Sequence, residues 1–207
     1  NREKVTILDI GCNIGYYALI AADILDDCGD IYAFEPDPKN IELANRNISL
    51  NGYGKIIKTY PYAIGSENGE AKFQQHPTHS NWSHMTETDR VAIPETDPSP
   101  ESGKQITVDV KSIDEFLLEE NVSVNSIDIV RMDVEGFEKE VLNGMTELLS
   151  GADDLVVMLE IHRLYLDDDD VSEMIDILSG SEFKITHSFP PVNDYSEVYD
   201  MDFSNLI

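Results

Sequence analysis

Short apolar runs alternate with longer segments of helical periodicity along the first third of the chain. The apolar run at Val5–Ile10 predicts a buried strand, and apolar positions three and four residues apart predict a helix over Gly15–Leu25. The alternation continues with a strand at Ile31–Glu35, a helix from Pro38 to Asn51 and a strand at Ile56–Ala63. This β-α-β-α-β order is typical of a parallel sheet with right-handed crossovers.

The middle of the chain departs from this alternation. Ala71–Gln75 and Ile106–Val110 each have the pattern of a strand, and we expect the two to pair. Between them lies a polar stretch, His76–Lys104, which contains four of the nine prolines and the only tryptophan. A loop of this length is usually a functional lid or a disordered insert, and both interpretations stay open. In the first case Trp82 and Met85 would close over a substrate.

The strand and helix alternation resumes after this stretch. The pattern predicts helices over Ser112–Glu119, through Val141 to Leu148 and over Val171–Leu178, and strands at Ile127–Met132, Leu155–Ile161 and Phe183–His187. The tail, Tyr195–Ile207, is a candidate edge strand. Nothing indicates a second domain, so we expect residues 1–207 to form a single α/β domain.

The charge balance narrows the choice of partners. The 207 residues include 41 acidic and 14 basic ones, which gives a formal net charge of −27. Such a chain repels nucleic acid and anionic membranes, so we expect neither as a partner. The acidic residues are dispersed along the chain, and lysine is scarce. This distribution favours a protein that works in high salt, where screening is strong.

The lack of an expected membrane span or signal region and the small number of cysteines bear on the compartment in which the protein works. No apolar run approaches the roughly 18 residues of a membrane span, and the N-terminus enters a strand without an apolar signal region. Cys12 and Cys28 lack a metal-type spacing and are expected as reduced thiols. These features favour a cytoplasmic protein. The oligomeric state stays open, with a homodimer as one option.

Acidic residues collect where the predicted parallel strands end. Asp9 and Glu35 end the first two strands, Asp133 follows a later one, and Glu160 lies at the end of another. Ligands of open parallel sheets bind outside the carboxyl ends of the strands, near the switch in strand order. We therefore expect these acids to converge on a site.

The glycines after the first strand discriminate between cofactors. Glu35 lies twenty residues after Gly15, where an acid accepts hydrogen bonds from ribose hydroxyls of either NAD or S-adenosylmethionine. The spacing of Gly11 and Gly15 is G-x-x-x-G, whereas a dinucleotide site requires G-x-G-x-x-G. Asp9 would repel a pyrophosphate but can pair with a cationic amine. Together these four residues, Asp9, Gly11, Gly15 and Glu35, favour S-adenosylmethionine as the cofactor. An NAD-linked oxidoreductase or epimerase stays as the alternative.

Several motifs resemble one family of methyltransferases. DIGCNIGYY at 9–17 and FEPDP at Phe34–Pro38 resemble class I methyltransferases, and RMDVEGFEKEVLNG at Arg131–Gly144 and LEIH at Leu159–His162 resemble the FkbM family among them. The resemblance implies a Rossmann-like, mostly parallel seven-stranded sheet with helices on both faces and an inserted β-hairpin. It also implies S-adenosylmethionine-dependent O-methylation of a small-molecule or glycan hydroxyl. Arg131 stands where the family often has lysine, and these side chains differ in hydrogen-bond geometry.

The expected cofactor contacts surround the first turn. They are Asp9, Gly11, Asn13, Gly15, Tyr16 and Glu35, and the resemblance alone adds Ala63, whose backbone would meet the adenine.

The expected catalytic residues are Asp133, Glu135, Glu160 and His162. Asp133 would orient the acceptor hydroxyl or accept its proton; alternatively it caps the following helix. Glu135 is either a site acid or a partner of that helix's dipole. Glu160 and His162, two apart on a strand, would form an acid/base pair or hold a divalent metal with Asp133, and no metal is assigned. A catalytically silent protein that keeps the cofactor pocket is the other alternative.

Overall fold

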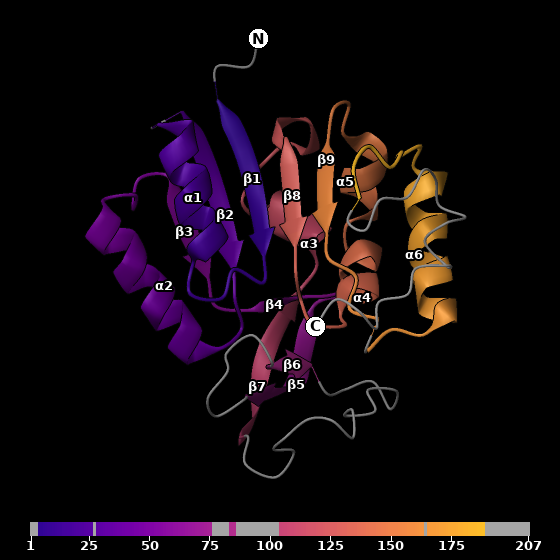
Figure 1. The fold of residues 1–207 in the computed structure, drawn as a ribbon, viewed down its shortest axis with the longest axis horizontal. Coiled ribbons are helices and arrows are strands. Elements are labelled where there is room, and N and C mark those ends of the chain that lie inside the picture. The colour runs from indigo at the N-terminus through magenta and orange to yellow at the C-terminus, as the bar shows by residue number, and fades with distance from the viewer. Residues whose placement is uncertain (1–3, 27, 76–82, 86–103, 164, 189–207) are drawn as a thin grey trace.

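A parallel sheet of five strands forms the centre of the molecule (Figure 1). The computed structural model describes residues 4–26, 28–75, 83–85, 104–163 and 165–188. The strand order is β3-β2-β1-β8-β9, and all four neighbouring pairs are parallel. The strands are β1 (Val5–Ile10), β2 (Gly29–Phe34), β3 (Ile57–Tyr60), β8 (Ile129–Met132) and β9 (Val156–Leu159). The sheet order reverses at β1, which lies between β2 and β8, so the predicted switch point is present.

Helices cover both faces of this sheet, as predicted. Successive residues of β1 point to opposite faces, so Ile7 packs in a core with Ala18 and Leu8 packs in a larger core with Phe116. The helices are α1 (Tyr16–Leu25), α2 (Pro38–Asn51), α3 (Ile113–Glu119), α4 (Glu138–Asn143), α5 (Thr146–Gly151) and α6 (Asp168–Gly180), with a 3₁₀ turn at Val124–Ser126. None of the helices in the described part of the chain is long and apolar enough to span a membrane.

A second, four-stranded sheet lies beyond the carboxyl ends of the parallel strands (Figure 1). Its order is β4-β7-β5-β6, with β4 at Ala63–Ile64, β5 at Gly69–Gln75, β6 at His84–Met85 and β7 at Lys104–Lys111. The predicted pairing of the strands on either side of the insert is confirmed: β5 and β7 are antiparallel. This sheet supplies one wall of the pocket described below.

Three predicted elements differ from the structure. The strand expected over Ile56–Ala63 is two strands in two different sheets, divided at Pro61, which has no N–H for a ladder. The helix expected through Leu148 is divided into α4 and α5 at Gly144, where a β-carbon would lie 1.9 Å from a backbone oxygen. Phe183–His187 has no strand conformation.

The strand count also differs from the implied seven, since the parallel sheet has five strands in the part of the chain that the structure describes. The general architecture is nevertheless the one expected, a mostly parallel sheet with helices on both faces. The tail at Tyr195–Ile207 and most of the His76–Lys104 stretch, including Trp82, lie outside the described residues.

Candidate functional site

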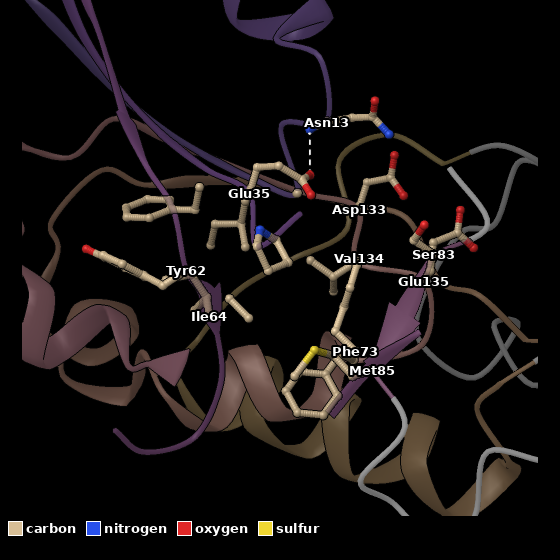
Figure 2. A pocket seen from close by; sticks show the side chains of 16 residues that line it. Asn13, Glu35, Tyr62, Ile64, Phe73, Ser83, Met85, Asp133, Val134 and Glu135 are labelled. Carbon is tan, nitrogen blue, oxygen red and sulfur yellow. Dashed lines mark hydrogen bonds between the residues drawn. The ribbon is translucent and has the colours of Figure 1, made fainter. Parts of the chain in front are cut away.

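A pocket opens at the carboxyl ends of β1, β2 and β8 (Figure 2). Six predicted site residues line it: Gly11 and Asn13 after β1, Glu35 after β2, Ala63 in β4, and Asp133 and Glu135 after β8. The second sheet adds Phe73 and Met85 as an apolar wall. The strand ends that the sequence predicts to converge therefore do converge, and they do so at the switch in strand order.

The turn after β1 depends on its backbone conformation. Gly11, Asn13 and Gly15 all have positive φ angles, of 78°, 51° and 83°. A β-carbon on Gly11 would lie 2.0 Å from the backbone oxygen of Asp133. The absence of a side chain at Gly11 thus lets the first turn pack directly against the segment that carries Asp133.

Glu35 ties this turn to the end of β2. Its Oε2 accepts a hydrogen bond from the backbone N–H of Asn13 at 3.0 Å (Figure 2). Its Oε1 accepts one from the N–H of Asp37 at 2.8 Å. The side chain is buried, and burial raises the pKa of its carboxyl to about 7 although these hydrogen bonds oppose the shift.

Asp9 lies beneath the turn rather than on the pocket wall, and Arg131 is its partner. Arg131 Nη1 is 3.3 Å from Asp9 Oδ1 and 3.1 Å from the backbone oxygen of Gly11, and its Nη2 is 2.6 Å from Asp133 Oδ2. Burial raises the pKa of Asp9 to about 6, against the opposing effect of Arg131. Asp9 Oδ2 is buried and makes no hydrogen bond within the described residues.

Two further predicted contacts do not line the pocket. Gly15 precedes the first residue of α1, and Tyr16 is 61% exposed. The neighbouring Tyr17 instead contacts the site indirectly, because the Arg131 guanidinium lies 4.1 Å from the centroid of its ring. Helix α1 therefore supports the Arg131 side chain by a cation–π contact.

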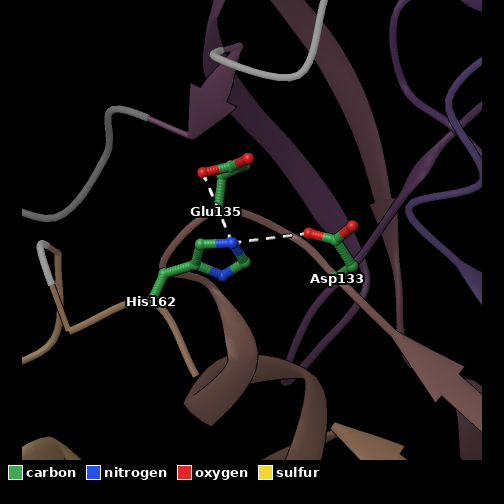
Figure 3. Close-up of side chains that lie close together, drawn as sticks. All are labelled: Asp133, Glu135 and His162. Atoms are coloured by element: carbon green, nitrogen blue, oxygen red, sulfur yellow. Dashed lines mark ion pairs between the residues drawn. The ribbon is translucent and has the colours of Figure 1, made fainter. Parts of the chain in front are cut away.

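Beside the pocket, Asp133 and Glu135 approach His162 (Figure 3). His162 Nε2 lies 3.5 Å from Asp133 Oδ1 and 3.6 Å from Glu135 Oε2. Glu160 Oε1 is 3.8 Å from the same nitrogen, so the predicted proximity of Glu160 and His162 is confirmed, although both follow β9 rather than lie within it. All four predicted catalytic residues thus form one cluster.

The start of helix α4 bears on the alternative role weighed for Asp133. Helix α4 begins at Glu138 behind Phe137, and no side chain caps it. The acids in its first turn are Glu138 and Glu140. Asp133 is therefore not its cap. Glu135 lies three residues before the helix, and its two alternatives, site acid or dipole partner, stay predictions.

Glu138, which was not among the predicted site residues, holds His162 in place. Its side chain is fully buried, and its Oε1 lies 2.6 Å from His162 Nδ1. The available signal was its position as the last acid of the E-G-F-E motif at 135–138.

The electrostatics of the cluster follow from this crowding. Burial raises the pKa of Glu135 to about 7; His162 opposes the shift and the neighbouring carboxylates add to it. Burial disfavours the charged form of His162, but the hydrogen bond to Glu138 and the charges of Glu138, Glu135 and Asp133 prevail and raise its pKa to about 9. At neutral pH His162 is therefore a proton donor rather than a general base.

Comparisons with known proteins agree on one family. The model of the methyltransferase FkbM domain matches residues 9–185. The chain is 28% identical over 192 residues to the hexuronic acid methyltransferase AglP of Haloferax volcanii, which covers 93% of this chain and 68% of that protein. It is 24% identical over 204 residues to the 2-O-methyltransferase NoeI of Sinorhizobium fredii, covering 91% of this chain and 76% of that one.

Solved structures support the fold. A methyltransferase FkbM from Methylobacillus flagellatus has a TM-score of 0.55 and 16% identity over 86% of this chain, which spans 37% of that longer chain. A putative rRNA-methylase from Clostridium thermocellum has a TM-score of 0.50 and 9% identity, covering 93% of this chain and 83% of the other. At these identities the likeness shows a shared class I methyltransferase fold alone.

Proposed function

This chain belongs to the methyltransferase FkbM domain family, and we propose that it transfers a methyl group from S-adenosylmethionine to a hydroxyl oxygen of a small molecule or glycan. The observation that carries the proposal is the single pocket shared by the Gly11 turn, the Glu35 carboxylate and the Asp133–Glu135 segment. In this pocket the proposed methyl-donor site adjoins carboxylates that can accept a proton, and methyl transfer to a hydroxyl requires both.

The cofactor half of the pocket suits S-adenosylmethionine. Glu35 Oε1 accepts from the N–H of Asp37 and from Asn40 Nδ2. Its Oε2 accepts only from the N–H of Asn13 among the described residues and retains acceptor capacity for ribose hydroxyls. Ala63 and Phe73 offer an apolar wall for the adenine. When bound, the cofactor supplies a methyl group made electrophilic by its sulfonium. We assign Asp9 a positioning role, because it holds the turn through Arg131 instead of lining the pocket.

The remaining predicted contacts, Gly15 and Tyr16, act through the start of α1. Gly15 provides the left-handed backbone that opens the helix, and Tyr16 lies at the exposed end of the same turn. We propose that Asn13, whose N–H is held by Glu35, faces the amino-acid moiety of the cofactor.

The acceptor half must orient the hydroxyl and take its proton. The hydroxyl oxygen bonds to the methyl carbon as the carbon–sulfur bond breaks, and the electron pair of that bond stays on sulfur. The proton passes to Asp133 or Glu135, both on the pocket wall. His162 orients these carboxylates, and Glu160, with a side chain 63% exposed, passes the proton to solvent.

The acceptor is proposed to be a sugar hydroxyl. Two relatives that align with more than nine-tenths of this chain are named a hexuronic acid methyltransferase and a 2-O-methyltransferase. The family match also favours the methyl-donor interpretation over the NAD-linked alternative.

An isotope assay tests the proposed function. The chain is incubated with S-adenosylmethionine carrying a ¹³C-methyl group and a panel of hexuronic acids and neutral hexoses, and O-methyl signals are followed by NMR. We expect one methyl ether per S-adenosylhomocysteine formed, and a loss of at least about 100-fold in kcat for Asp133→Asn. Glu70→Gln, on an exposed side chain of β5, serves as the control. Cofactor binding without transfer to any hydroxyl would instead support the catalytically silent alternative.

A further inference from the structure

We propose that Asp133, Glu135 and His162 hold a divalent cation of the Mn²⁺ or Mg²⁺ class beside the cofactor pocket. Each residue offers one ligand atom, and these atoms lie within 4.8 Å of one another (Figure 3). One imidazole and two carboxylates form a donor set that such ions accept. From the sequence, Glu160 and His162 were candidates to hold a metal with Asp133, and none was assigned. The geometry keeps Asp133 and His162 and puts Glu135 in the place of Glu160.

The distances suit a shared ion. Two ligand atoms that each lie about 2.1 Å from one ion are about 3.0 Å apart in octahedral and about 3.4 Å apart in tetrahedral geometry. His162 Nε2 lies 3.5 Å from Asp133 Oδ1 and 3.6 Å from Glu135 Oε2. Both distances lie within a few tenths of an ångström of the tetrahedral spacing, and all three ligand atoms lie within 4.8 Å of one another.

A second observation concerns the far side of the imidazole ring. A metal-binding histidine usually donates its other ring N–H to a carboxylate, which fixes the tautomer and the ring orientation. Glu138 Oε1 lies 2.6 Å from His162 Nδ1, and the same oxygen accepts from the N–H of Gly136 at 3.1 Å. Glu138 is fully buried, and its Oε2 has no hydrogen-bond partner in the described part of the chain. This carboxylate holds Nε2 toward Asp133 and Glu135.

The backbone conformation at Glu135 and Gly136 also favours a binding site. Glu135 and Gly136 have positive φ angles of 51° and 95°, and a β-carbon on Gly136 would lie 2.3 Å from Tyr165 Cβ. The turn that carries Glu135 therefore packs tightly on the segment that follows His162. Strain of this kind persists where the surrounding structure enforces it, often at binding sites.

The charges of the surrounding side chains also favour a cation at this position. Four carboxylates surround one imidazole: Asp133, Glu135, Glu138 and Glu160. Of their oxygens, Arg131 contacts Oδ2 of Asp133. Oδ1 of Asp133 is thus left to face Nε2. Partly buried like charges repel unless a cation compensates them. A protonated His162 supplies one positive charge, and a divalent ion in place of its Nε2 proton would supply two.

The site adjoins the methyl-transfer pocket, since Asp133 and Glu135 line both. This part of the inference rests on the proposed function. With the ion bound, Asp133 and Glu135 would be its ligands, so Glu160 would replace them as the proton acceptor. The cation would bind the acceptor hydroxyl and lower its pKa, and the proton would leave to Glu160 as the oxygen bonds to the methyl carbon.

A manganese titration tests the site. The full chain, first freed of metal with a chelator, is titrated with Mn²⁺ in 1 M KCl, and free Mn²⁺ is followed by electron paramagnetic resonance. The high salt suppresses diffuse binding to the acidic surface. We expect one Mn²⁺ per chain, displaced by excess Mg²⁺. His162→Gln and Asp133→Asn should each weaken binding at least about tenfold, and Glu138→Gln by about 10–100-fold.

Matched controls separate the outcomes. Glu70→Gln removes an exposed carboxylate and should leave the affinity unchanged, and thermal melts verify that each variant is folded. Absence of saturable binding, or equal binding by wild type and a folded His162→Gln variant, would overturn the metal site. Calorimetry with S-adenosylhomocysteine without metal is run in parallel, so that a failed metal site and a failed cofactor assignment are distinguished.

Discussion

At the scale of single residues, Arg131 connects the two halves of the site. Strand pairing between β1 and β8 sets Asp9 opposite Arg131, and the guanidinium then contacts Asp9, the backbone oxygen of Gly11 and Asp133. A planar fork with several donors can serve these acceptors at once, whereas an ammonium group is a single point of charge. Arginine at this position, where lysine is common in the family, therefore couples the cofactor turn to the acceptor side.

Removing the Arg131 charge should destabilise the fold. Arg131→Ala leaves Asp9, which is 2% exposed, without its cationic partner, and we expect a loss of about 3–5 kcal/mol in the free energy of unfolding. Arg131→Lys should lose less, because it keeps the charge. Arg163→Ala, which breaks a pair with the largely exposed Asp168, should cost less than about 1 kcal/mol. Urea unfolding measures all three, and equal losses would contradict the assigned role.

Glu35 makes a pH-dependent contribution to stability. Its folded pKa of about 7 lies above the ordinary value of 4.5, so the folded state retains a proton that the unfolded state has lost. This contribution is fully present below about pH 4.5 and is lost as the pH rises through about 7. The free energy of unfolding of the wild type should therefore decline between pH 5 and pH 8. Glu35→Gln should remove about 2–3 kcal/mol of this decline. Glu70→Gln should show the wild-type decline in the same urea experiment.

At the scale of elements, local patterns predicted most of the sheet and missed what depends on distant contacts. Strand β1 has the predicted bounds, because its apolar run is buried on both faces. The divisions at Pro61 and Gly144 depend on the second sheet: a side chain at Gly144 would meet the backbone of Gly65, far away in sequence. Phe183–His187 has strand-like composition but no strand conformation.

In the candidate site, too, local patterns predicted some residues and missed contacts between distant segments. The acids at strand ends were predictable, because parallel strands bring their carboxyl ends to one edge. The Asp9–Arg131 pair depends on the register between β1 and β8, and the Glu138–His162 contact joins residues 24 apart. Neither can be inferred from the periodicity of one segment.

The close packing of the turn after β1 against the segment that carries Asp133 can be tested by substitution. Gly11→Ala places a β-carbon 2.0 Å from the backbone oxygen of Asp133, so we expect the turn to move away from β8 and binding of S-adenosylhomocysteine to be lost. Gly52→Ala is the matched control: its φ of 81° is similar, but nothing lies within 4 Å of the added carbon. It should cost only about 1–2 kcal/mol of backbone strain and leave binding intact. Similar binding by the two variants would argue against close packing of the turn.

At the scale of the whole molecule, the charge of −27 is the dominant feature. With 41 acidic and 14 basic residues, most carboxylates have no basic side chain to pair with. Their mutual repulsion opposes the compact state and is weakened by salt, since the Debye length falls to about 3 Å at 1 M.

Salt should therefore stabilise the protein. We expect the melting temperature to rise by several degrees between low and molar KCl, because screening weakens repulsion in the folded state more than in the expanded one. Differential scanning calorimetry across a KCl series measures the effect. A melting temperature that stays constant or falls would count against adaptation to high salt.

The central claim is that the pocket at the end of β1 binds S-adenosylmethionine. Calorimetric titration of the chain with S-adenosylhomocysteine and, separately, with NADH tests it most directly. We expect one S-adenosylhomocysteine bound per chain, and no heat from NADH. Glu35→Ala should bind S-adenosylhomocysteine at least about tenfold more weakly, because the ribose contacts of Glu35 are lost. Binding of NADH with no response to S-adenosylhomocysteine would contradict it.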